Sequence, residues 1–491
     1  MKKTLLFLLI WTVFNALMGQ STGILYKIPS PASGIESIVK YVPSMNQHII
    51  YAVKYSSTME NHFLLTDMVN VVDAHVSDNY IISDFEVIDN YVVFCGRYYY
   101  SGGSTGIIGW FDIDSLFNYG VPVHIDQSLY TLGLESLDNI EVFRDVSGQV
   151  HVAGYGSYIL PIGYYKYRIF EAIGNLPGYM WSRAADFCSF FSPRLSEVVD
   201  MTVTDNYVVF LEHDKSDPAD VSYGPYGVGI SLYPLPKYNM LSTTTIPDFF
   251  FQTVTYNNFP DHIVPDYQDP VTKPKIAYSG EEKVAVCSYR RDMDPGSMGH
   301  TLNQWYLVHR VYDLNPYLSS GSPIVMTSAA MAPLPDDVGL FNGFEYDPVK
   351  KKYITLNRHT VSIGVNETAV TTIDFSSGSA PTFIMSDYQA AYNTNSYWLP
   401  NSICLDGASN YTVSGCNSPS YEPVLWQNIV NLSEGRCDRK VLYAMQSLET
   451  MPFKEEYCNA EVQGWNRLVY GERPEVVLLH FTCIELCNPN N

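Results

Sequence analysis

Residues 87–97 read Val-Ile-Asp-Asn-Tyr-Val-Val-Phe-Cys-Gly-Arg, and residues 203–213 read Val-Thr-Asp-Asn-Tyr-Val-Val-Phe-Leu-Glu-His. Seven of the eleven positions are identical, and the two copies begin 116 residues apart. In each copy a polar turn precedes an apolar run rich in Val and Phe, residues that favour β-structure. This order is typical of an antiparallel hairpin, in which the chain turns and returns as a second strand.

Weaker copies of the same pattern recur along the chain, and one of them lies halfway between the two clear ones, so the repeat is about 58 residues long. These copies are residues 41–51, 143–154, 277–287, 346–356 and 404–414. A third apolar strand follows several copies, at residues 106–113, 227–233, 305–312 and 368–375, and a poorer fourth strand follows it.

Four antiparallel strands per repeat are typical of propeller blades. Seven copies therefore predict an all-β β-propeller with about seven four-stranded blades, and the uneven spacing of the copies leaves six or eight blades open. A row of separate β-sandwiches is the alternative, but units of about 100 residues would not explain the shorter period.

Composition excludes several other classes of protein. The chain has 491 residues, a formal net charge of −22, 14% aromatic residues and 16% charged residues. Binding to nucleic acid needs clustered Lys and Arg, which this charge argues against. Disordered chains have few aromatic residues, and coiled coils are dominated by Ala, Glu, Lys and Leu.

The first residues predict export. Lys2 and Lys3 precede an apolar run over 5–14, and small residues end at Gly19. This is the pattern of a secretory signal peptide at residues 1–19, and no second apolar stretch is long enough to span a membrane. We therefore expect a protein that is soluble after cleavage and is secreted, periplasmic or in the cell envelope. Residues 20–491 are expected to form one monomeric propeller domain, in which the two ends pair and residues 470–486 supply closing strands.

The nine cysteines are unevenly placed. Cys95 and Cys287 each end a short apolar run, which predicts buried free thiols. Six others crowd a closing segment that begins at about residue 400, and in an oxidising compartment they predict up to three disulfides of undetermined connectivity. These six are Cys404, Cys416, Cys437, Cys458, Cys483 and Cys487.

The hairpin-plus-strand copies resemble those of secreted bacterial β-propellers, and the leader ending at Gly19-Gln20 resembles that of exported Bacteroidetes proteins. The resemblance covers nearly the whole chain but lies in its architecture. The Trp-Asp repeat ending, the regular Gly-Gly pattern of kelch repeats and the Asp box of sialidases do not occur in the sequence. The resemblance therefore implies a fold and no particular activity.

The predicted binding site lies on one face of the propeller. In such a fold the loops between second and third strands emerge on the same face, and cationic or aromatic residues recur there in several copies. Aromatic rings can stack on sugars or anchor a protein partner. These positions are Arg97, Tyr98, Tyr99, His213, Tyr223, Tyr226, Arg290, Arg291, Arg358 and His359.

Candidates for catalysis or metal binding are weaker. Glycoside hydrolysis needs an acid and a base or nucleophile in one pocket, and Asp residues occur in three polar segments, 214–220, 261–269 and 292–294. Calcium is the one ion these segments suggest, although Asp292 and Asp294 lack the other ligands of a twelve-residue calcium loop. No catalytic residue, cofactor or metal site is assigned.

We therefore expect a non-enzymatic propeller that recognises a glycan or a protein through its second-to-third-strand loop face. The alternatives are a glycan-active hydrolase or lyase, with acid and base drawn from the inner strand ends, and a structural protein of the cell envelope.

Overall fold

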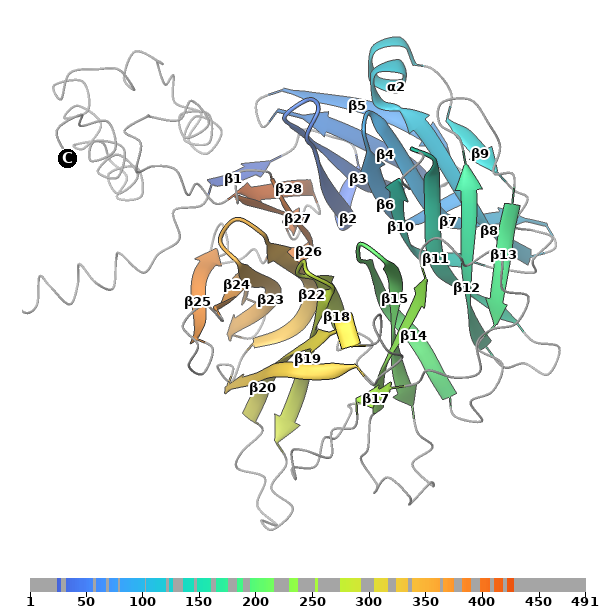
Figure 1. Ribbon diagram of the computed structural model, residues 1–491. Helices are drawn as coiled ribbons and strands as arrows, with labels where there is room; N and C mark the ends of the chain where they lie inside the picture. Colours follow the sequence, from blue (N-terminus) through green and yellow to red (C-terminus); the bar gives the residue numbers. More distant parts are fainter. Residues whose placement is uncertain are drawn as a thin grey trace, which may run out of the picture.

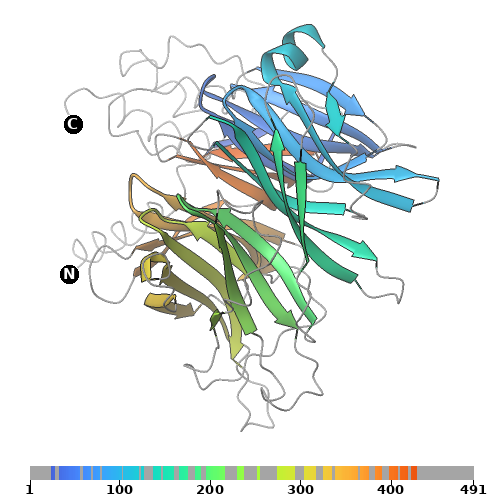
Figure 2. The same ribbon diagram turned by 45° about the vertical axis from the view of Figure 1, so that its right-hand side comes forward.

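The computed structural model describes residues 24–427 with gaps; residues 1–23 and 428–491 lie outside the described residues. The described part of the chain forms seven four-stranded antiparallel sheets. In Figures 1 and 2 the sheets follow one another around a common axis in chain order, from blue through green to orange. The predicted all-β propeller is confirmed, and we number its blades 1 to 7.

Blade 1 consists of β2 (Ser33–Val42), β3 (Gln47–Tyr55), β4 (Met59–Thr66) and β5 (Val71–Ser77). Blade 2 consists of β6 (Tyr80–Ile88), β7 (Tyr91–Tyr100), β8 (Gly103–Asp112) and β9 (His124–Asp126). Blade 3 consists of β10 (Ser136–Arg144), β11 (Val150–Ile159), β12 (Tyr165–Gly174) and β13 (Arg183–Cys188). Blade 4 consists of β14 (Leu195–Val203), β15 (Tyr207–Lys215), β16 (Gly229–Pro236) and β17 (Gln252–Val254).

Blade 5 consists of β18 (Lys275–Tyr278), β19 (Lys283–Asp292), β20 (Gln304–Asp313) and β21 (Val325–Pro333). Blade 6 consists of β22 (Val338–Asp347), β23 (Lys352–Ser362), β24 (Val365–Asp374) and β25 (Thr382–Gln389). Blade 7 consists of β26 (Trp398–Leu405), β27 (Tyr411–Asn417), β28 (Glu422–Gln427) and β1 (Ile24–Lys27).

The ring closes by pairing distant parts of the chain. Strand β1 is the outermost strand of blade 7 and pairs antiparallel with β28, so that Ile24 lies opposite Gln427. Strand β2 of blade 1 also contacts β26 and β27, and both views place blade 7 beside the first blade (Figures 1 and 2). The predicted closing strands at 470–486 lie outside the described residues, and the described closure uses residues 24–27, which the sequence analysis did not assign to a strand.

Apolar side chains pack between neighbouring blades. Between blades 1 and 2, the Phe63 ring lies edge-on to Phe85 and Phe111, with ring centroids 5.4 and 4.9 Å apart. All three rings are at most 2% exposed. Burial of one such side chain contributes about 1.5–3 kcal/mol, so the interfaces between blades are the core of the molecule.

The innermost strand of several blades carries a β-bulge at the same place. A single residue is extra at Ser83 in β6, Asp138 in β10, Val199 in β14 and Asn401 in β26. We call the next residue of each strand the post-bulge position. A bulge bends and re-aims a strand, and here it recurs around the axis.

A short α-helix interrupts the repeat in blade 2. Helix α2 (Ile113–Tyr119) follows β8 and precedes β9. The Asp112 side chain caps its first turn by accepting a hydrogen bond from the Ser115 N–H at 2.7 Å. Gly120 ends it in the left-handed conformation at φ 64°, which glycine adopts without steric cost.

The cysteines follow the prediction only in part. Cys95 is a buried free thiol, as expected, and the thiol of Cys287 is buried as well. Cys404 and Cys416 are also buried free thiols, in contrast to the predicted disulfides. They cannot bridge each other, because Cys404 pairs with Thr412 and Cys416 lies four residues further along β27, about 13 Å away at 3.3 Å per residue. The other four cysteines lie outside the described residues.

Candidate functional site

The post-bulge positions carry polar side chains in several blades and form one layer around the axis. We call this the upper layer; it comprises the post-bulge residues Asp84, Asn139, Asp200 and Ser402, together with Lys275, which begins β18 at the corresponding register opposite Cys287. Two residues further along each innermost strand, on the same side of the strand, lies a second layer. We call this the lower layer, and its charged members are Lys40, Glu86, Glu141 and Glu345.

Hydrogen bonds between blades show that these positions correspond. The Asp84 carboxylate of blade 2 accepts the Ile140 N–H of blade 3 at 3.2 Å. The Asp200 carboxylate of blade 4 accepts the Ile276 N–H of blade 5 at 2.9 Å. In both cases the post-bulge side chain of one blade accepts a hydrogen bond from a backbone N–H of the next blade. That N–H belongs to the residue directly after Asn139 in blade 3 and directly after Lys275 in blade 5. The carboxylates of the upper layer therefore join adjacent innermost strands.

The lower layer is an electrostatic unit drawn from four blades. The Lys40 ammonium donates a hydrogen bond to Glu86. Burial alone would lower the pKa of Lys40, but the surrounding carboxylates, led by Glu86, raise it well above its ordinary value. The four groups lie on the innermost strands of blades 1, 2, 3 and 6, so the layer draws on non-adjacent parts of the ring.

Several carboxylates of the two layers hold their protons unusually tightly. Burial raises the pKa of Asp84 and of Glu345 to about 7, although Lys40 acts in the opposite direction on both. Burial, together with the charge of Glu86, also raises the pKa of Glu141 well above its ordinary value. These shifts leave carboxylic acids that can hold or release a proton near neutral pH.

Parts of the two layers meet solvent. The side chains of Lys40 and Glu86 are 26% and 21% exposed, and Lys275 is 28% exposed. Glu141 and Glu345 are half-buried, and neither forms a hydrogen bond or an ion pair with another described residue. These two carboxylates can therefore accept hydrogen bonds from a bound molecule.

The amide of Asn139 adds a further acceptor. Its side-chain oxygen is buried and has no hydrogen-bond partner within the described part of the chain. Buried polar atoms are nearly always paired, so such an atom needs an explanation. Asn139 occupies the same position as Asp84 and Asp200, which bond to the next blade. A ligand or a water molecule in the channel would satisfy it.

The predicted loop-face residues lie on the second strands. Arg97, His213 and Arg358 occupy equivalent positions on the second strands of blades 2, 4 and 6. Each lies two residues beyond the residue that pairs with the innermost strand at Asp84, Asp200 or Gly343, respectively. Arg290 and Arg291 lie at the end of β19, and His359 follows Arg358 in β23; Tyr223 and Tyr226 lie outside the described residues. The structure describes no side chains for His213, Arg290, Arg291, Arg358 or His359. The backbone positions of these residues agree with the predicted binding face. Whether their side chains form such a face stays a prediction.

In blade 2 the side chains are described. The Arg97 guanidinium carbon lies 6.0 Å from the centroid of the Tyr99 ring, at the reach of a cation–π contact. Tyr99 is 49% exposed. Tyr98, by contrast, is half-buried and packs against the core between blades 1 and 2. Tyr99 is therefore the better placed of the two to contact a ligand.

The loop face and the upper layer lie towards the same end of the propeller axis. Strand β7 runs towards its loop with β8, and Arg97 pairs with Ile81, three residues before Asp84 along β6. Glu86 lies two residues beyond Asp84, about 7 Å deeper. The upper layer is therefore nearer to the loop face than the lower layer is.

The acidic segments suggested by the sequence are not part of these layers. Asp214 and Asp292 lie at the ends of β15 and β19, and most of the other candidates lie outside the described residues. No group of three or more His, Cys, Asp or Glu side chains among the described residues is placed to hold a metal ion. Asp294, half of the suggested calcium pair, is outside the described residues, so calcium remains untested.

Sequence reasoning missed the channel carboxylates, although a signal was present. Three of the innermost strands contain the same triplet, an apolar residue, Glu and another apolar residue, just before the hairpin turn. The triplets are 85–87, 140–142 and 344–346. A charged residue at the same place in three buried strands is costly unless it lines a cavity or meets a counter-charge.

Comparisons with known proteins show no family for this chain. No protein-family model and no curated protein matches the chain. Among solved structures, the β-propeller domain of the Trilobed protease from Pyrococcus furiosus is similar at a TM-score of 0.41 and 8% identity, over 83% of this chain and 96% of that one. A polysaccharide lyase of family PL25, an ulvan lyase, matches at a TM-score of 0.42 and 8% identity, over 83% and 94%. A GH32 β-fructofuranosidase from Bombyx mori matches at 0.31 and 10%, over 87% and 98%.

Among the described residues, no helix is long and apolar enough to cross a membrane.

Proposed function

We propose that this protein is an exported, monomeric propeller that recognises a glycan at the channel end that faces its second-to-third-strand loops. The observation that carries the proposal is the pair of charged layers, in which Glu141 and Glu345 lack bonds to other described residues. Sugar hydroxyl groups are hydrogen-bond donors, and half-buried carboxylates are strong acceptors for them. A protein ligand at the same face and a structural role in the envelope are the alternatives.

The loop face supports the same proposal. Tyr99 offers an exposed ring against which a sugar can stack, and Arg97 above it keeps that ring in a defined place. We expect Arg97 and His213, which share a register position, to contribute to one continuous site above the upper layer.

The test is retention on a panel of host and plant polysaccharides by the purified chain. We expect at least one glycan to be retained, and Glu141→Gln to weaken its affinity at least tenfold at a pH high enough to ionise Glu141, because the new amide has nearly the same shape but no charge. Glu281→Gln is the control, since Glu281 is exposed on a hairpin turn at the opposite end of the blades. No retained glycan, or equal affinity of wild type and Glu141→Gln, would contradict the proposal.

A glycan-active hydrolase or lyase is a second candidate, favoured by one observation. The pKa of Glu345, raised by burial to about 7, suits a carboxylic acid that donates a proton to a leaving group near neutral pH. Glu141 or Glu86 would then serve as base or nucleophile. Oligosaccharides detected by mass spectrometry would support this activity, and Glu345→Gln should abolish their release while leaving retention largely intact.

A further inference from the structure

The positive and negative charges around the propeller axis do not balance. All seven positions of the lower layer are described, and its uncharged members are Thr202, Ala277 and Cys404 of blades 4, 5 and 7. Burial raises the pKa of the Cys404 thiol, which therefore stays neutral. The innermost strands of successive blades contact one another all the way round the ring. Lys40 is thus the only cation in a layer that contains three Glu residues.

Both lysines of the two layers already have carboxylate partners. Lys40 donates a hydrogen bond to Glu86 in the lower layer. In the upper layer the Lys275 ammonium lies 3.8 Å from the Asp200 carboxylate. Among the described residues, the remaining carboxyl groups of the two layers therefore have no ammonium group in direct contact.

The side chains that lack a partner offer hydrogen-bond acceptors. Glu141 of blade 3 and Glu345 of blade 6 are half-buried, and neither bonds to another described residue. Asn139 lies two residues before Glu141 on the same side of β10, about 7 Å away, and its buried amide oxygen has no partner in the described part of the chain. Burial and the negative charge of Glu86 both raise the pKa of Glu141 and of Glu345. A positive charge at this place acts in the opposite direction and stabilises both carboxylates.

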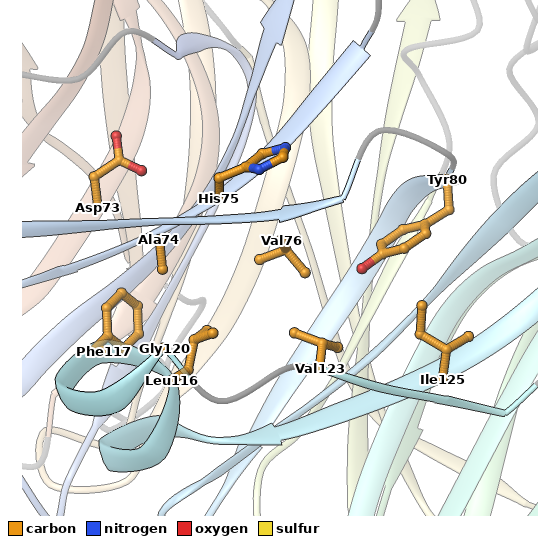
Figure 3. Close-up of a pocket in the computed structure, with 10 residues that line it drawn as sticks. All are labelled: Asp73, Ala74, His75, Val76, Tyr80, Leu116, Phe117, Gly120, Val123 and Ile125. Atoms are coloured by element: carbon orange, nitrogen blue, oxygen red, sulfur yellow. The ribbon is translucent and has the colours of Figure 1, made fainter.

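A hollow of about 510 Å³ between the outer parts of blades 1 and 2 does not offer such groups. Figure 3 shows Ala74 and Val76 of β5 facing α2, with Asp73 and His75 on the other side of the strand. Asp73 is the one carboxylate among the residues that line the hollow, and its oxygen already lies 2.7 Å from Nδ1 of His62. A cationic ligand therefore finds carboxylates without a partner around the axis and not in this hollow.

We propose that the ligand at the axis is a glycan built from amino sugars, with a sugar ammonium group beside Glu141 and Asn139. The inference rests on the proposed glycan-binding function and names the chemical class of the glycan. A primary ammonium group has three donors and no acceptor, so it complements a set of acceptors that carries excess negative charge. Its hydrogen bond to a carboxylate is about twice as strong as one between neutral groups. An acidic sugar would instead add a further negative charge to the layers.

The experiment is isothermal titration calorimetry of the full chain with a glucosamine trimer and with its N-acetylated counterpart, at a pH at which the sugar amines are protonated. The two ligands share their rings and linkages, and acetylation replaces each ammonium group by a neutral amide. We expect the glucosamine trimer to bind saturably and at least tenfold more tightly. A galacturonic acid trimer, which is an anion, should bind more weakly than either.

Two variants separate a contact with Glu141 from general attraction to an acidic chain. Glu141→Gln should bring the affinities for the glucosamine and N-acetylated trimers within about threefold of each other. Glu281→Gln removes the same charge from an 83% exposed side chain and should keep the full preference. Salt at about 0.15 M screens attraction between exposed charges. Circular dichroism establishes that each variant is folded, and Glu345→Gln replaces Glu141→Gln if the latter does not fold.

The inference is overturned if the N-acetylated trimer binds as tightly as the glucosamine trimer, or if Glu141→Gln and Glu281→Gln alter the preference equally. Retention of a neutral or acidic glycan by the same chain would then leave the proposed function intact. If no glycan of any charge is retained, the proposed function fails together with this inference.

Discussion

Glu282 joins the hairpin turns of blades 4 and 5 and is the clearest single contact between blades at that end of the ring. Its side chain is 5% exposed. One carboxylate oxygen accepts the Thr204 hydroxyl at 2.8 Å, and the other accepts the Asn206 backbone N–H at 3.0 Å and side-chain amide at 2.9 Å. Glu282→Ala removes all three bonds at once.

The expected loss can be worked from these contacts. Hydrogen bonds to a charged group contribute about 1.5–3 kcal/mol each, and a buried donor left unpaired costs about 1–3 kcal/mol. Asn206 is exposed, so water can replace its two bonds, whereas Thr204 is 2% exposed and keeps a longer contact, at 3.3 Å, to the Tyr207 carbonyl oxygen. We therefore expect Glu282→Ala to lower the free energy of unfolding by about 2–4 kcal/mol, most of it from the buried half of the contact.

The neighbouring residue supplies a matched control. Glu281 has nearly the same backbone conformation, with φ 53° against 55° for Glu282, so an alanine meets the same backbone cost at both positions. Its side chain is 83% exposed and bonds only to Lys283 among the described residues, at 2.9 Å. Glu281→Ala should therefore have a much smaller effect.

Urea titration and thermal unfolding of wild type and both variants measure the difference. Because a chain of this length can unfold through intermediates, the comparison rests on the shift of each midpoint under identical conditions. The account predicts a clearly lower midpoint for Glu282→Ala than for Glu281→Ala. Equal shifts in the two variants would refute the assignment of Glu282 as the contact between the two blades.

Three further predictions concern other parts of the ring. Gly109→Ala should destabilise the chain by about 1–3 kcal/mol in urea titration, because the new Cβ would lie 2.0 Å from the Phe94 ring; a wild-type midpoint would contradict this. Burial raises the pKa of Asp84 from 3.8 to about 7, so the folded chain binds that proton more tightly and its stability should fall as pH rises from about 4 to above 7. Asp84→Asn should flatten that slope, and an unchanged slope would exclude Asp84 as its source. Cys95 and Cys287 should react with a thiol reagent only after denaturation, since both are 0% exposed; labelling of either in the native protein would be inconsistent with the fold.

The fold could be predicted from the sequence because its information is local and repeated. The turn around Asp89 and the following strand from Tyr91 recur around Asp205 and from Tyr207, and the structure makes both pairs antiparallel hairpins. The third strands at 106–113 and 305–312 correspond to β8 and β20 within a few residues. Such patterns depend on turn chemistry and strand alternation within a few residues of each other.

The remaining features depend on contacts between distant segments. The closing strand β1 has four residues, and only its pairing with Glu422–Gln427 identifies it. Helix α2 has seven residues, too short for its periodicity to stand out between two strands. The register that brings Lys40 beside Glu86 arises from seven innermost strands meeting at one axis, and no single segment of sequence contains it.

The candidate site shows the same division. The shared position of Arg97 and His213 was visible in the repeat, because both belong to copies of one hairpin. The carboxylates of the two layers come from first strands that look like ordinary apolar strands in isolation. Their raised pKa values result from burial around a common axis, which sequence spacing does not reveal.

The central claim is that a ligand site lies in the channel, and the most direct test is the affinity of one retained glycan for wild type, Glu141→Gln and Glu281→Gln, measured by calorimetry. The account predicts at least a tenfold loss for Glu141→Gln and no change for Glu281→Gln. Equal affinities for all three proteins, or a loss in both variants, would contradict it.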